Sequence, residues 1–149
     1  MSATDRDRAL ELLSDFIGTR ISSIECDEFQ LRLVFEDKSV FATESPWRLL
    51  LRGDLLVGSG DIKEGGSEEI FQHLKTLKAK SVASSGWGDT QLAFENDYVL
   101  EVISNSVRYE AWQAHLRAGW VVFMGGRSIT VFPPSAPLPN SAESRSRMV

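Results

Sequence analysis

The chain has 149 residues, of which 42% are hydrophobic and 25% are charged, a balance typical of one folded domain rather than a disordered chain. Its 16 basic and 21 acidic residues give a formal net charge of -5. This charge argues against a nucleic-acid partner, because binding to phosphates requires basic side chains. No stretch approaches the roughly 20 apolar residues of a membrane span, and the N-terminal segment has acids where a secretory signal would be basic. We therefore expect a cytoplasmic protein that binds neither nucleic acid nor membrane.

The first elements are predicted from the spacing of apolar residues. Helical spacing predicts an amphipathic helix over residues 5–17, and Gly18 is a natural stop for it. Beyond Gly18, apolar and polar residues alternate as they do in half-buried strands. Five short antiparallel strands are predicted in this part, around residues 21–24, 30–35, 39–43, 47–51 and 55–59.

The second part of the chain follows the same order. Ser67 is predicted to cap a second helix, whose buried stripe ends at Leu77. The segment 109–116 contains good helix formers, but we predict a strand there because its counterpart, 47–51, has the strand pattern. The strand patterns of this part lie at residues 81–84, 90–94, 98–103, 109–116, 120–124 and 128–132.

Two stretches, 35–57 and 94–122, match each other. The matched pairs are Val40 with Val99, Trp47 with Trp112, Leu51 with Leu116, Arg52 with Arg117 and Val57 with Val122. We predict a single α+β domain over residues 1–132 with an internal repeat of about 5–60 and 67–132. The expected fold is two pseudo-symmetric halves, each a helix followed by about five short antiparallel strands. The matched tryptophans should pack in the core.

Residues 133–149 are rich in Pro and Ser and contain few residues that could be buried in a core. Such a composition cannot offset the conformational entropy that ordering would cost. We predict a disordered tail.

Motifs for catalysis or metal binding are weak. The Gly-Ser-Gly segment at 58–60 follows a strand, but Asp61 would repel a phosphate, so we predict a structural turn. His73 and His115 lack the spacing of zinc ligands. Cys26, the only cysteine, lies among acidic residues that should raise its pKa and leave it inert. We predict no catalytic residue, no metal and no cofactor.

Features confined to the second part of the chain are candidates for binding. Trp87 lies between two glycines, and the connection 104–110 is longer than its counterpart and carries Arg108, Tyr109 and Glu110. Aromatic and charged side chains on loops are typical of protein-binding surfaces. The alternatives are a tryptophan folded over the edge of the core and a wider loop that only relieves strand register. We predict partner-binding residues at Trp87, Arg108, Tyr109 and Glu110.

The last third of the chain carries a series of short motifs. The series is Tyr109-Glu110-Ala111-Trp112, then Gly119, an apolar strand at 121–123, Gly125-Gly126 and a final strand at 129–132. It resembles the C-terminal part of small bacterial proteins of an uncharacterised family, although Met124 and Arg127 depart from the pattern in the last turn. The resemblance implies a bacterial protein and no particular activity.

These features favour a non-catalytic protein-binding module of the bacterial cytoplasm, similar in general character to the immunity proteins that neutralise toxins. The alternative is an enzyme or small-ligand binder with a pocket between the two halves. A cleft that holds His115 beside two carboxylates would favour the enzyme. A flat surface that exposes Trp87 and Tyr109 would favour the binding module.

Overall fold

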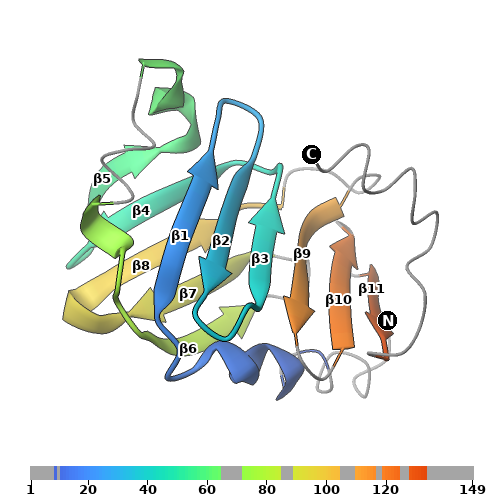
Figure 1. The fold of residues 1–149 in the computed structure, drawn as a ribbon. Helices are drawn as coiled ribbons and strands as arrows, with labels where there is room; N and C mark the ends of the chain where they lie inside the picture. Colours follow the sequence, from blue (N-terminus) through green and yellow to red (C-terminus); the bar gives the residue numbers. More distant parts are fainter. Residues whose placement is uncertain are drawn as a thin grey trace.

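The computed structural model of the chain describes residues 9, 11–64, 72–84, 89–104, 110–116, 119–124 and 128–133. Its described residues form eleven strands in two antiparallel sheets that face each other (Figure 1). The front sheet has the order β1 (Ile21–Cys26), β2 (Leu31–Phe35), β3 (Val40–Thr43), β9 (Glu110–Leu116), β10 (Gly119–Met124) and β11 (Ser128–Phe132). The rear sheet has the order β5 (Asp54–Gly58), β4 (Trp47–Leu51), β8 (Tyr98–Val102), β7 (Thr90–Phe94) and β6 (Ala79–Ser84).

The predicted α+β class is wrong, because the molecule is mainly β-sheet. In the part of the chain that the structure describes, helix is confined to short pieces. These pieces are residues 9–13 without residue 10, residues 72–74, and three 3₁₀ turns: η1 (Ser14–Phe16), η2 (Ser59–Glu64) and η3 (Glu95–Asp97). The first helical piece crosses the lower end of the sandwich in Figure 1 instead of covering a sheet.

The inner faces of the two sheets bury each other, which explains why no layer of helices is needed. Leu31, Leu33 and Phe35 alternate along β2 and are at most 1% exposed. Trp47 and Trp112 are 4% and 1% exposed, so their predicted place in the core is confirmed. The ring of Trp112 also stacks on Phe41, with the ring centroids 5.4 Å apart. Apolar side chains buried in this way supply most of the stability of a sandwich.

Two strand pairings join the first half (β1–β5) to the second half (β6–β11), and they have equivalent registers. In the front sheet β3 pairs with β9, and Val40 lies opposite His115. In the rear sheet β8 pairs with β4, and Val99 lies opposite Leu50. Val40 of β3 thus corresponds to Val99 of β8, and Leu50 of β4 corresponds to His115 of β9. The two pairings therefore have the same register. Whether the halves arose by duplication remains a prediction.

One local correspondence differs from the predicted match. The register of β4 with β5 shifts between Leu49 and Leu50, so β5 contains one additional residue. Leu49 of β4 and Ala114 of β9 are equivalent positions in the two sheets. Val57 lies opposite Leu49, Val121 lies opposite Ala114, and both valines are buried. Val57 is therefore the structural counterpart of Val121 and not of Val122. The prediction of a strand at 109–116 is confirmed by β9.

Candidate protein-binding groove

The turn between β1 and β2 is organised by Asp27. Its Oδ1 accepts hydrogen bonds from the backbone N–H groups of Phe29 (2.8 Å) and Gln30 (2.9 Å), and its own N–H donates to the Gln30 carbonyl (3.0 Å). An Asp side chain that bonds backbone groups two or three residues ahead fixes a tight turn. The turn leaves the Phe29 side chain 73% exposed, which is unusual for an aromatic residue.

The connection between β3 and β4 forms the opposite side of the same hollow. Thr43 is buried, and its Oγ1 accepts a hydrogen bond from the Ser45 N–H (3.0 Å). The Trp47 N–H donates to the Ser59 Oγ at 3.2 Å, which ties the start of β4 to the start of η2. Three separate segments of the first half thereby line an open groove of about 490 Å³. Its lining residues are 27–30, 43–47 and 59–60.

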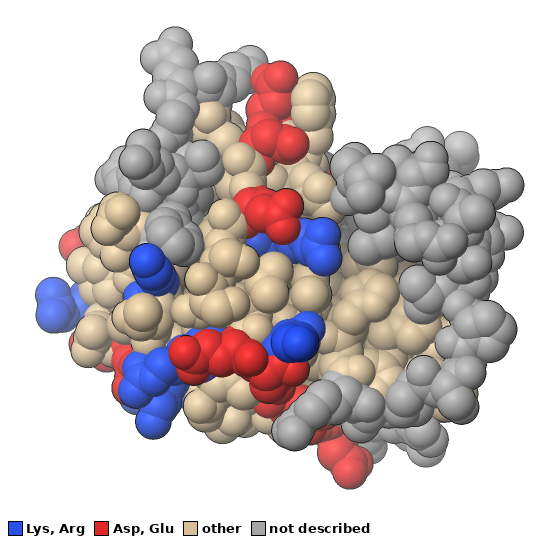
Figure 2. Space-filling view, viewed as in Figure 1, with Lys and Arg blue, Asp and Glu red and all other residues tan. Residues whose placement is uncertain are grey.

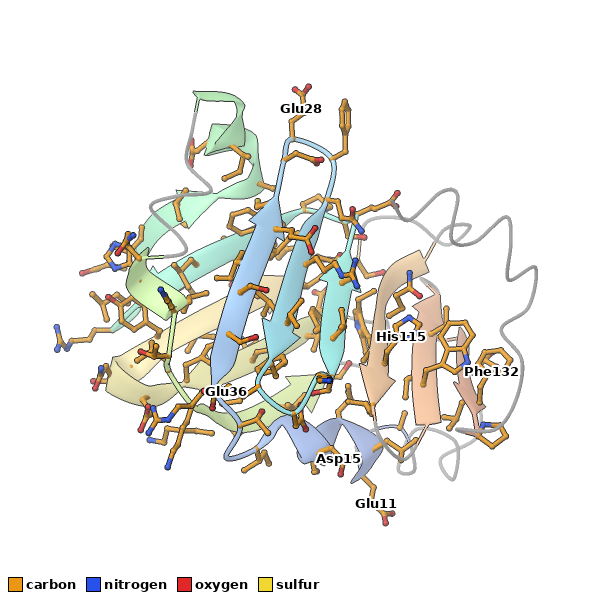
Figure 3. The ribbon with its side chains drawn as sticks, viewed as in Figure 1. Glu11, Asp15, Glu28, Glu36, His115 and Phe132 are labelled. Atoms are coloured by element: carbon orange, nitrogen blue, oxygen red, sulfur yellow. The ribbon has the colours of Figure 1, made fainter. Side chains whose placement is uncertain are left out.

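The groove is acidic. Asp27, Glu28 and Glu44 line it, and none of its described lining residues is Lys or Arg. Asp27, Glu28 and Glu44 are all exposed, and Asp27 also uses one carboxylate oxygen to hold the turn. Figure 2 shows red side chains gathered at the upper end of the front face, and Figure 3 places Glu28 there, at the tip of the β1–β2 turn. An exposed aromatic ring beside exposed carboxylates is suited to a basic, partly apolar protein segment.

The predicted partner-binding residues are not brought into this groove by any described feature. Trp87, Arg108 and Tyr109 lie outside the described residues, and Glu110 begins β9 with a side chain outside the described set. The groove was not predicted, because the acids beside Cys26 were considered only for their effect on its pKa and the sequence does not show which segments meet there. One sequence signal could have found it: Phe29 falls between two predicted strands, 21–24 and 30–35, as Trp87 falls between the predicted strands 81–84 and 90–94.

His115 lies on the outer face of the front sheet, not in the groove. Its ring stacks on Trp120 (centroids 5.0 Å apart), and its Nε2 lies 3.2 Å from the Gln113 Oε1. Burial, and then the positive charge of Arg32, lower the pKa of His115 below its ordinary value of 6.5. The groove itself is built from first-half residues alone, so it is not the expected pocket between halves.

Cys26, His73 and the Gly-Ser-Gly segment at 58–60 each make contacts that stabilise the fold. Burial, and then the charge of Asp27, raise the pKa of the Cys26 thiol to about 11, so the predicted increase is confirmed, although burial is its main cause. His73 Nδ1 lies 2.7 Å from the Tyr98 hydroxyl. The Gly58 N–H donates to Asp61 Oδ2 (2.9 Å), so a group that a phosphate could use is already bonded to a carboxylate. Within the described ranges, no three His, Cys, Asp or Glu side chains are grouped as metal ligands.

No protein-family model, curated protein or solved structure matches this chain closely enough to indicate a family. In the described part of the chain, none of the helices is both long and apolar enough to cross a membrane.

Proposed function

We propose that this chain is a non-catalytic protein-binding module of the bacterial cytoplasm, and that its acidic groove binds a basic segment of a partner protein. The observation that carries the proposal is Phe29, a 73% exposed aromatic ring on a turn held by Asp27. Aromatic side chains, phenylalanine among them, are enriched at the cores of protein interfaces. A ring held on an ordered turn also loses little conformational entropy when a partner binds.

The chemistry of the groove supports a protein partner in preference to a nucleic acid. Its exposed carboxylates, Glu28 and Glu44, would repel phosphates but attract lysine and arginine side chains. The net charge of -5 would add to this attraction over a longer range. An immunity protein that neutralises a basic toxin belongs to this class of binder.

The test begins with a partner captured from a lysate of the native host by the unaltered chain, then identified and purified. Titration calorimetry should give at least a tenfold weaker Kd for Phe29→Ser and for Glu28→Lys. Added salt should weaken binding to the unaltered chain, because exposed charges are screened.

Glu36→Lys is the matched control, since Glu36 is an exposed acid in the β2–β3 turn and changes the net charge equally. In Figure 3 Glu36 lies at the end of the front sheet opposite Glu28. Its binding should stay within about twofold of the unaltered chain. Unchanged Kd values for both groove variants, at unchanged melting temperature, would refute the proposed site.

A further inference from the structure

Among the described strands, β5 forms one edge of the rear sheet (Figure 1), and it exposes two leucines. Leu55 is 63% exposed and Leu56 is 37% exposed. Edge strands are usually protected by lysines, prolines or other charges that prevent pairing with another chain. The only charged residue of β5 is Asp54, at its first position. β5 also contains a bulge between Leu55 and Val57, but it has no Lys or Pro, and an edge strand that exposes two leucines is suited to pairing with a further strand.

The front sheet shows what lies beside the counterpart of β5. Leu50 lies opposite Leu55 in the β4–β5 pair, just as His115 lies opposite Trp120 in the β9–β10 pair. In the front sheet a third strand, β11, continues this row and places Phe132 opposite Trp120. The two rings stack with centroids 4.5 Å apart. His115, Trp120 and Phe132 thus form a row of three, whereas Leu50 and Leu55 form a row of two.

We infer that β5 pairs in antiparallel fashion with β5 of a second copy of this chain, with Leu55 opposite Leu55. In that register both leucines lie on the outer face of the joined sheet. Each takes the place that Phe132 has beside Trp120, and the row becomes Leu50, Leu55, Leu55 and Leu50. The pairing has two-fold symmetry, so it closes as a dimer and does not propagate into a fibre.

The charges and backbone of β5 are compatible with this register. Asp54 lies opposite Leu56 of the second copy, so like charges do not face each other. The Gly58 N–H is already bonded to Asp61 of its own chain, which ends the pairing before Gly58. In this register β5 of the second copy places a large apolar residue, its own Leu55, opposite Leu55.

Sedimentation equilibrium of the full chain tests the inference. The unaltered chain should form dimers, and Leu55→Asp should weaken association at least tenfold because two carboxylates would face each other. Ile17→Asp is the control, since Ile17 is also an exposed apolar residue (47%) but lies outside β5 and outside the proposed groove, so its dimerisation should be unchanged. Exposed side chains at both sites allow each variant to fold.

A charge-pair experiment fixes the register. Leu55→Asp and Leu55→Lys should each be monomeric alone and should form a heterodimer when mixed, because opposite charges then meet at the two-fold axis. An unaltered chain that stays monomeric at about 0.5 mM would overturn the inference. So would a Leu55→Asp variant that associates like the unaltered chain, or a mixture that associates no better than its components. The proposed groove does not depend on this result, because β5 does not line it.

Discussion

The β4–β5 and β9–β10 hairpins occupy equivalent places in the two sheets and differ in what lies beside them. β10 is covered by β11 along five residue pairs, whereas β5 is an edge. Gly119 begins β10 with a φ of 149°, and a Cβ there would clash with the Phe132 carbonyl oxygen. Asp54 holds the equivalent position in β5 and is exposed. The covering strand therefore excludes a side chain at Gly119, and the open edge tolerates one at Asp54.

The largest expected effect concerns the residues that the two halves share. Trp112→Ala and Trp47→Ala should each lower the free energy of unfolding by about 3–5 kcal/mol, because both remove a large buried side chain. Trp112 should be the more costly of the two, since it also stacks on Phe41. Urea titration gives both values. A loss of less than about 0.5 kcal/mol for either would place that tryptophan on the surface.

A smaller effect should separate the covered strand from the open one. Gly119→Ala should cost about 1–3 kcal/mol, because the positive φ is strained for any other residue and the new Cβ would press on the Phe132 carbonyl. Asp54→Ala is the matched control and should stay within about 0.5 kcal/mol of the unaltered chain. Equal losses from the two substitutions in urea titration would remove the distinction between the hairpins.

Many of the strands could be predicted because apolar and polar residues alternate along them. Leu31, Leu33 and Phe35 show the period of two, and β2 is found where that pattern lies. The class was wrong because helical spacing over 5–17 predicts a helix but does not show whether helices cover a sheet. Here the two sheets bury each other, and a 3₁₀ turn follows at Ser14–Phe16.

Long-range features were the hardest to predict. The additional residue in β5 produced the incorrect match of Val57 with Val122, because a bulge changes which residues face each other without altering the apolar pattern. The groove combines segments at 27–30, 43–47 and 59–60, and only the fold brings them together. The exposure of Phe29 likewise depends on the hydrogen bonds of Asp27, which spacing alone does not predict.

The row of His115, Trp120 and Phe132 contains a titratable group, whereas its counterpart, Leu50 and Leu55, does not. Only the first row should therefore make stability depend on pH. His115 has a lowered pKa in the folded chain, so below its ordinary value of 6.5 the unfolded chain binds a proton that the folded chain does not. Stability should therefore fall as the pH drops below 6.5, and this decrease should end once the pH is below the pKa of His115 in the folded chain. His115→Leu places the counterpart Leu50 side chain there and should remove this contribution. Unfolding titrations at about pH 7.5 and 5.5 should show the smaller decrease for the variant.

Parallel pH profiles for the two proteins would show that His115 does not contribute. An NMR titration of the His115 ring provides a second readout, because its pKa should lie below 6.5 in the unaltered chain. Arg32→Gln should move that pKa upward, since the Arg32 charge is the second cause of the shift. An unchanged pKa in Arg32→Gln would leave burial as the only cause.

The smallest effect should come from removing residues 134–149, which lie outside the described part of the chain. Their Pro-rich, Ser-rich composition offers little apolar surface, so the melting temperature should change by no more than about two degrees. Removing 128–149 is the informative companion, because it also deletes β11 and uncovers Trp120. That protein should melt far lower, since Phe132 stacks on Trp120 and β11 pairs along β10. If removing 134–149 alone lowered the melting temperature as much as removing 128–149, the stability would depend on the tail and not on the pairing of β11 with β10.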